Sequence, residues 1–213
     1  MSDALIFFSH QKTNLLDLYS DSFRTHIFHD YAEWKKQRIF SPAIIITGED
    51  QNYTSSILDK IRRDEDLFAS LCFVSESIPA SYNNLVDGQL PQPPKLKEII
   101  NHFLDLSSAY KNSEAQISHL GRLVKYLWLR PNFILQPCQE WQHLRFYRYP
   151  LLEVLSRDES DSFEWLQSLS ASKLLEPVAL IDRQRECAFC HSSHLSFIDI
   201  CPSCHAIDID LEA

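Results

Sequence analysis

The chain has 213 residues, of which 45% are hydrophobic and 12% aromatic, so it holds enough apolar material for one large domain or two small ones. Its formal net charge of −9 argues against nucleic acid as the main partner. Three glycines are too few for a glycine-rich phosphate loop. No basic segment precedes the short apolar run near the N-terminus, and no apolar stretch is long enough to cross a bilayer, so we expect a cytoplasmic protein without membrane contact.

The first ninety residues alternate short apolar runs with amphipathic segments. The runs at 4–8, 25–28, 43–47 and 71–74 are predicted strands, and the segments 13–22, 31–38 and 53–68 are predicted helices. Uniformly apolar strands separated by helices are typical of a parallel sheet covered on both faces. We therefore expect an α/β fold, a small flavodoxin-like and receiver-like domain over residues 1–94. The proline-rich stretch 87–94 ends it, because proline continues neither a helix nor an inner strand.

The following residues return to a helical period and then mix helices with strands. Residues 95–112 are predicted as a connecting helix, and 113–130 as a helix that opens an α+β output domain over 113–182. Within that domain we expect strands at 133–138, 146–149 and 178–181, and helices at 151–155 and 161–175. A winged-helix-like arrangement is one candidate for this domain. We expect residues 183–213 to form a separate zinc-binding hairpin with four cysteine ligands.

Two Cys-x-x-Cys pairs near the C-terminus are the strongest chemical signal in the chain. They are Cys187-Ala-Phe-Cys190 and Cys201-Pro-Ser-Cys204, separated by ten residues. Each pair supplies two thiolates from a tight turn, and the spacing allows a hairpin that brings both turns to one tetrahedral Zn²⁺, as in a zinc ribbon or knuckle. Four thiolates leave no open position on the metal. The predicted cofactor is therefore a single structural zinc ion.

The sequence is also compatible with other chemistry for these cysteines. Each pair is followed by histidine, at His191 and His205, and Cys-x-x-Cys-His is also the attachment motif for c-type haem. Haem attachment requires export, and no export signal is present. A residue that follows a zinc turn favours a left-handed backbone, which histidine tolerates. A dithiol redox pair, or a histidine in place of one cysteine ligand, are further alternatives, whereas Cys72 and Cys138 are predicted as inert core residues.

A basic and aromatic stretch lies in the middle of the chain, between residues 116 and 150. Its five basic residues are opposed by Glu140 alone, and seven aromatic residues are interleaved with them. Such a surface is suited to stacking on bases or binding a nucleotide, which gives the alternative function of a nucleotide or nucleic-acid binding module. The favoured explanation is that the aromatic residues are core, and that the basic residues lie on a solvated face or pair with carboxylates of the first domain. The candidate ligand-binding residues are Arg122, Lys125, Arg130, Arg145 and Arg148.

Three motifs in the second half carry a family resemblance. They are Leu127-Trp128-Leu129-Arg130-Pro131, Phe146-Tyr147-Arg148-Tyr149-Pro150-Leu151-Leu152, and Ile181-Asp182-Arg183 leading into the cysteine pairs. In order and spacing this part, roughly 115–210, resembles the thaumarchaeal output domain, a metal-binding module attached to signalling proteins. The resemblance implies that Cys187, Cys190, Cys201 and Cys204 are zinc ligands and that the role is signalling output rather than catalysis. Family members commonly continue into further cysteine-containing sequence.

The first domain resembles a receiver domain that has lost its chemistry. A working receiver has acidic residues after its first strand to hold Mg²⁺ and an aspartate after its third to accept phosphate. Here Ser9 and His10 follow the first strand, Thr47 and Gly48 follow the third, and no lysine follows a fifth strand. Glu49 and Asp50 come slightly later, without metal-binding partners, and Ser75 matches the receiver hydroxyl. Phosphotransfer is not expected, whereas docking or dimerisation by a pseudo-receiver is.

These patterns together predict a non-enzymatic zinc-binding regulatory protein that acts through protein partners in a signalling pathway. No nucleophile–base spacing and no paired-carboxylate motif stands out that would indicate an enzyme. The segment 183–213 has two basic residues against five acidic ones, which would repel phosphate, so nucleic acid is not an expected partner of the hairpin. A homodimer through the first domain is compatible with the sequence, although no residue specifies it.

Overall fold

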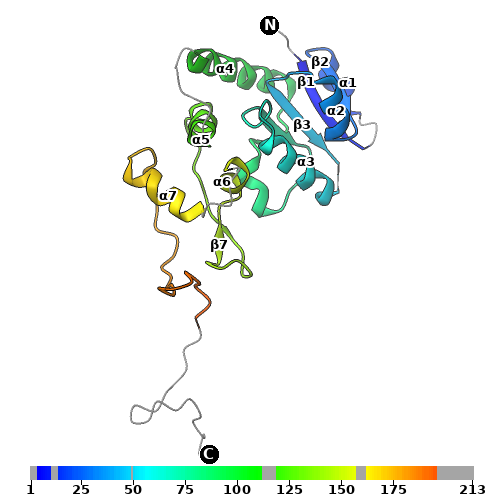
Figure 1. Cartoon of the computed structure of the whole chain (residues 1–213). Helices are drawn as coiled ribbons and strands as arrows, with labels where there is room; N and C mark the ends of the chain where they lie inside the picture. The colour runs from blue at the N-terminus through cyan, green and yellow to red at the C-terminus, as the bar shows by residue number, and fades with distance from the viewer. Residues whose placement is uncertain (1–3, 11–13, 49, 112–118, 157–161, 196–213) are drawn as a thin grey trace, which may run out of the picture.

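The centre of the molecule is a parallel sheet of five strands. The computed structural model describes residues 4–10, 14–48, 50–111, 119–156 and 162–195. The strand order is β2-β1-β3-β4-β5 (Figure 1), which is the order of flavodoxin-like folds. The predicted α/β fold of the first part is therefore confirmed. The strands are β1 (Ala4–Ser9), β2 (Arg24–Phe28), β3 (Ala43–Thr47), β4 (Leu71–Val74) and β5 (Gly88–Gln89).

The inner strands lie at the centre of the sheet because their residues are almost all apolar. Every residue of β1, β3 and β4 is buried, as expected for strands covered on both faces. β1 pairs with β2 on one side and with β3 on the other, and all strand pairs in this sheet are parallel. By contrast, the edge strand β2 mixes exposed and buried positions, and only Phe28 is fully buried in it. The burial pattern thus fixes which strands are central.

Helices α1 (Leu15–Ser20), α2 (Tyr31–Gln37) and α3 (Gln51–Arg63) connect the first four strands. Right-handed crossovers in this strand order place α1 on one face of the sheet and α2 and α3 on the other. Asp30 begins α2 by accepting a hydrogen bond from the N–H of Glu33. Asp50 begins α3 in the same way, since its side chain accepts hydrogen bonds from the N–H groups of Asn52 and Tyr53.

The proline-rich segment contains a fifth strand that the sequence did not reveal. β5 has only two residues, and it pairs in parallel with Phe73 and Val74 of β4. A 3₁₀ helix, η1 (Ala80–Leu85), precedes it. Helix α4 (Pro93–Lys111) then starts with prolines in its first turn, where their missing N–H groups would have no intrahelical acceptor. The Tyr19 hydroxyl donates to the Pro91 carbonyl at 2.5 Å, so α4 begins beside α1.

The second half adds α5 (His119–Trp128), a hairpin of β6 (Cys138–Gln139) and β7 (Tyr147–Arg148), α6 (Pro150–Leu155) and α7 (Ser162–Ala171). Helix α6 packs on α3 and η1, and α5 packs on α6. Their apolar residues belong to the same hydrophobic cluster as the sheet. One core thus extends across the predicted boundary at residue 113, and the division into domains stays a prediction. The buried aliphatic and aromatic residues contributed by α5, α6 and the turn after α5 are Leu123, Tyr126, Leu129, Leu151, Leu152, Val154 and Leu155.

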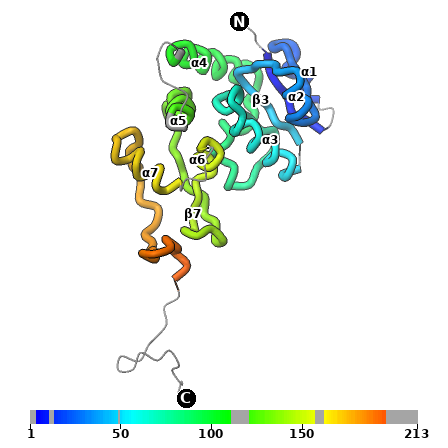
Figure 2. Tube along the Cα trace, in the orientation of Figure 1, coloured from blue at the N-terminus to red at the C-terminus, as the bar shows by residue number. Residues whose placement is uncertain are grey.

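Several predicted elements of the second half differ from the structure. The strands predicted at 133–138 and 146–149 shrink to the two-residue strands β6 and β7. Residues 178–181 lie in no strand, and Val178 and Leu180 are 74% and 71% exposed. Neither a winged helix nor a zinc ribbon is confirmed among the described residues. After α7 the chain leads away from the sheet, as the orange segment in Figures 1 and 2 shows. Within the described ranges, every helix is too short or too polar to cross a membrane.

Candidate metal centre and buried arginine cluster

The first cysteine pair lies in a tight turn closed by backbone hydrogen bonds. The N–H of His191 donates to the carbonyl of Cys187 at 2.9 Å, and the N–H of Cys187 donates to the carbonyl of Ser192 at 2.9 Å. His191 has a φ of 56°, in the left-handed region. The predicted left-handed backbone after this turn is therefore confirmed, and it lets the chain reverse directly after Cys190.

The same turn favours the thiolate form of Cys187. The backbone N–H groups of Cys190 and Phe189 donate to the Cys187 sulfur, and these hydrogen bonds lower the pKa of the thiol. Cys187 is half-buried and Cys190 is exposed, and both are free thiols. Because zinc binds thiolate and not thiol, this donor pair fits a zinc ion in both its chemistry and its access to solvent.

The second cysteine pair, Cys201 and Cys204, lies outside the described residues. Within the described part, no group of three or more potential ligands gathers around one point. The histidines near the turn have other contacts there, since His191 Nδ1 lies 3.3 Å from a carboxylate oxygen of Glu186, and His194 Nε2 lies 3.0 Å from the carbonyl of His143. His205 is also outside the described residues. The four-cysteine zinc site stays a prediction.

The cysteine turn is attached to the loop between β6 and β7. The N–H of Ser193 donates to the carbonyl of Leu144 at 2.9 Å, and the rings of His194 and Phe146 lie 4.3 Å apart. Arg145 forms an ion pair of 2.9 Å with Glu186, which immediately precedes Cys187. The cysteine turn is therefore held on this loop by direct contacts.

The five basic residues predicted as a ligand-binding surface do not form one surface. Arg122 and Arg130 are buried, with 4% and 8% of their surface exposed. Arg148 pairs with Glu140 and Glu153, and Arg145 pairs with Glu186 and lies over the ring of Phe163. Lys125 lies 5.3 Å from the centre of the Phe68 ring. The expected alternative, pairing with a carboxylate of the first domain, holds for Arg130.

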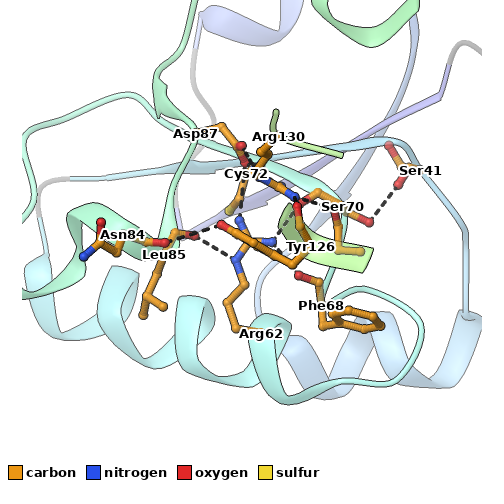
Figure 3. Close-up of polar contacts among 11 residues, drawn as sticks. Ser41, Arg62, Phe68, Ser70, Cys72, Asn84, Leu85, Asp87, Tyr126 and Arg130 are labelled. Atoms are coloured by element: carbon orange, nitrogen blue, oxygen red, sulfur yellow. Dashed lines mark hydrogen bonds and ion pairs between the residues drawn. The ribbon is translucent and has the colours of Figure 1, made fainter. Parts of the chain in front are cut away.

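Arg130 belongs to a buried cluster that joins the two halves of the chain (Figure 3). Its guanidinium forms two bonds with Asp87, at 2.6 and 3.0 Å, and donates to the carbonyls of Ala69 and Ser70. From the other side, Arg62 of α3 donates to the carbonyls of Leu85, Phe68 and Ser70 and reaches Asp87 at 3.4 Å. Tyr126 lies against both cations, with Arg130 3.8 Å from its ring centre.

Asp87 is the carboxylate that contacts both of these arginines. Burial alone would raise the pKa of Asp87, but the charges of Arg130 and Arg62 and a hydrogen bond from Arg130 outweigh burial and lower it. Asp87 also accepts the N–H of Cys72 at 2.7 Å, and its own N–H donates to the carbonyl of Cys72. The carboxylate therefore fixes the start of β5 against β4 while it neutralises the buried cations. No spacing in the sequence relates Asp87 to Arg62 or Arg130, so this cluster was not predicted.

Arg122 forms a second link between the halves. It donates to the carbonyl of Arg62 at 2.8 Å and lies over the ring of Phe68 at 4.4 Å. Carbonyls of the α3 C-terminus are natural acceptors for a cation, since the helix dipole places partial negative charge there. Arg122 and Arg130 therefore hold the second half of the chain on the first, which is a packing role.

The two isolated cysteines differ in their surroundings. Cys72 is completely buried in β4, and burial raises the pKa of its thiol to about 12. Such a thiol is inert, as predicted. Cys138 is only half-buried, contrary to the expected core position, because β6 belongs to a two-stranded hairpin whose own residues are only partly buried or exposed. Burial still raises the pKa of the Cys138 thiol.

Comparison with known protein families relates the second half of the chain to an output domain. Residues 111–213 match a family model described as thaumarchaeal output domain 1. The match covers the cysteine turn, the β6–β7 hairpin, and the helices α5, α6 and α7. No curated protein and no solved structure matches the chain.

Proposed function

We propose that this chain is a non-enzymatic regulatory protein that binds one structural Zn²⁺ and acts through contacts with protein partners. The turn from Cys187 to His191 carries the proposal, because it combines a stabilised thiolate with the backbone shape that follows a zinc turn. The family match to an output domain spans the same residues. Cys187, Cys190, Cys201 and Cys204 would hold the metal, and the bound zinc would supply cross-linking of the C-terminal segment.

In this proposal the sheet domain is a pseudo-receiver on which protein partners dock. The carboxyl ends of β1 and β3 carry Ser9 and Thr47 where a working receiver needs acidic groups. The Thr47 hydroxyl lies 3.4 Å from the carbonyl of Phe8, and Asp50 caps α3 through its side chain. These side chains have structural partners, which supports docking and not phosphotransfer as the role of this edge of the sheet.

The substitution Asp50→Ala tests whether Asp50 is the N-cap of α3 or a phosphate acceptor. We expect the free energy of unfolding to fall by about 1 kcal/mol, because α3 loses its N-cap. Incubation with acetyl phosphate should add no phosphate to the parent chain or to the variant, as judged by intact mass. Asp30→Ala, which removes the equivalent cap of α2, is the matched control and should show a similar loss of stability. Phosphorylation that Asp50→Ala abolishes would refute the pseudo-receiver.

Chelation tests the structural role of the metal. Treating the full chain with a strong zinc chelator should increase hydrogen exchange in residues 185–195 while β1, β3 and β4 stay protected, because the sheet core contains no proposed metal ligand. Readdition of zinc should restore the protection. An identical exchange pattern with and without metal would contradict a structural zinc site.

A further inference from the structure

A cavity of about 420 Å³ lies at the junction of the two halves of the chain. Helix α3 and η1 line it from the first half, and the β6–β7 hairpin and α6 line it from the second. These elements contact one another directly, and the side-chain amide of Asn84 in η1 donates to the carbonyl of Gln136 just before the hairpin. The volume is in the range of ligand-binding pockets, which often form where two structural units meet.

The charged side chains of this cavity are unequal in number. Arg148 of β7 serves two carboxylates, since it donates to Glu140 at 2.9 Å and to Glu153 at 3.0 Å. Arg63 and Asp59 of α3 form a second ion pair at 3.0 Å. The lining thus holds three carboxylates against two guanidinium groups, an excess of one negative charge, and these side chains are 27% to 53% exposed. A further cation would balance the carboxylates, whereas an anion would have to compete with them for the arginines.

The rest of the cavity wall is largely apolar. Leu85 of η1 and Pro150 and Val154 of α6 line it, and all three are buried. Tyr82 lines the same space, and an aromatic ring attracts a cation over its face. Lysine and arginine side chains combine an apolar stem with a cationic end, and therefore match both parts of the lining.

The cavity continues into a second hollow of about 430 Å³ along α3. The two spaces share Asp59, Ser81 and Tyr82, so they form one groove, which we call the α3–η1 groove. Amide and hydroxyl side chains both donate and accept hydrogen bonds, as the main chain of an extended peptide requires. The uncharged amides and serine hydroxyls that line the second hollow are Gln51, Asn52, Ser55, Ser56 and Ser81.

We propose that the α3–η1 groove binds an extended segment of a protein partner that carries an arginine or lysine side chain. The basic side chain enters the cavity beside Glu140 and Glu153, and the main chain of the segment lies along α3 in the second hollow. This inference rests on the proposed action through protein partners and is independent of the zinc site. Because the bound segment contacts both halves of the chain, its binding stabilises their junction.

Binding of two capped pentapeptides to the full chain tests this groove. One peptide has a central arginine flanked by serines, and the other has citrulline, which keeps the shape of arginine without its charge. We expect the arginine peptide to bind about tenfold more tightly, as measured by fluorescence anisotropy. In NMR spectra of the isotope-labelled full chain, it should shift the amide signals of Ser81, Tyr82 and Glu140.

Substitutions that remove one charge distinguish the groove from the general acidity of the chain. Glu140→Gln should weaken binding of the arginine peptide about five- to tenfold, while Arg148 keeps its pairing with Glu153. Glu98→Gln is the matched control, because Glu98 lies in an exposed pair with Lys95 on α4 and outside the groove lining. This variant should bind like the parent chain. Arg63→Gln should strengthen binding, because it releases Asp59 from its ion pair.

Equal affinity for the arginine and citrulline peptides, or equal weakening by Glu140→Gln and Glu98→Gln, would overturn the proposal. Inorganic phosphate that binds in the groove and is weakened by Arg63→Gln would identify an anion site and would also overturn it. Acetyl-arginine amide that binds as tightly as the pentapeptide would contradict a peptide groove. Zinc content, measured on the same samples, keeps the two proposals apart, since a chain that holds zinc but binds no peptide refutes the groove alone.

Discussion

Replacing Asp87 with alanine is expected to lower the free energy of unfolding by about 3–5 kcal/mol, the largest effect of any single substitution outside the apolar core. The change leaves Arg62 and Arg130 buried without their carboxylate, and it removes the acceptor for the N–H of Cys72. An uncompensated buried charge costs more than the pair contributes, since both cations have already lost their hydration. Chemical denaturation of the full chain, followed by circular dichroism, measures the loss.

Asp59→Ala is the matched control for this prediction. Asp59 pairs with Arg63 on the same helix as Arg62, but the side chains of both partners are about half exposed. Its loss should cost about 0.5 kcal/mol or less. Equal effects of the two substitutions would contradict a structural role for the buried cluster.

The cluster also predicts how stability depends on pH. The native pKa of Asp87 lies below that of an unfolded aspartate, about 3.9, so folding favours the deprotonated carboxyl. Its contribution is fully present at neutral pH and is lost as pH falls through and below about 4. The parent chain should therefore lose more stability than Asp87→Asn between pH 5 and pH 3, and parallel pH profiles would contradict this assignment.

The second large effect is expected on metal binding by Cys187→Ser and Cys190→Ser. A four-thiolate zinc site contributes about 10–16 kcal/mol of apparent binding free energy, so loss of one ligand should cost about 3 kcal/mol, roughly 100-fold in affinity. Competition with a chromogenic chelator measures the affinity of each variant. Cys187→Ser also removes the sulfur that the turn stabilises as a thiolate.

Cys138→Ser is the control for the cysteine variants. Cys138 carries the same thiol, but it lies in β6 and burial raises its pKa, which disfavours a metal-binding thiolate. This variant should bind zinc as tightly as the parent chain. A loss of affinity in Cys138→Ser equal to that in Cys187→Ser would show that the two-pair assignment of ligands is wrong.

The sheet could be predicted from the sequence because its signal is local. The runs 43–47 and 71–74 are continuous and apolar, and they coincide with β3 and β4. The left-handed residue after the cysteine turn was predicted for the same reason, since tight turns are determined by neighbouring residues. The two-residue strand β5 was missed because its pairing with β4 depends on Asp87 and not on a hydrophobic run.

The roles of the basic residues could not be predicted from the sequence. An arginine on an exposed face and one buried against carbonyls have the same local pattern, and only the tertiary contacts of Arg122 and Arg130 separate the two. The prediction of a strand at 178–181 was wrong. The β-branched and apolar residues of this exposed segment favour a strand, but the described part of the chain holds no partner strand for it. Both cases concern contacts between residues far apart in the sequence.

Metal analysis of freshly purified full-length chain tests the central claim most directly. Elemental analysis alongside protein quantitation should give one zinc ion per chain, and thiol titration under native conditions should find Cys187 and Cys190 protected until a chelator is added. Protein that contains no zinc and binds none on addition, or that joins these two cysteines in a disulfide, would contradict the account.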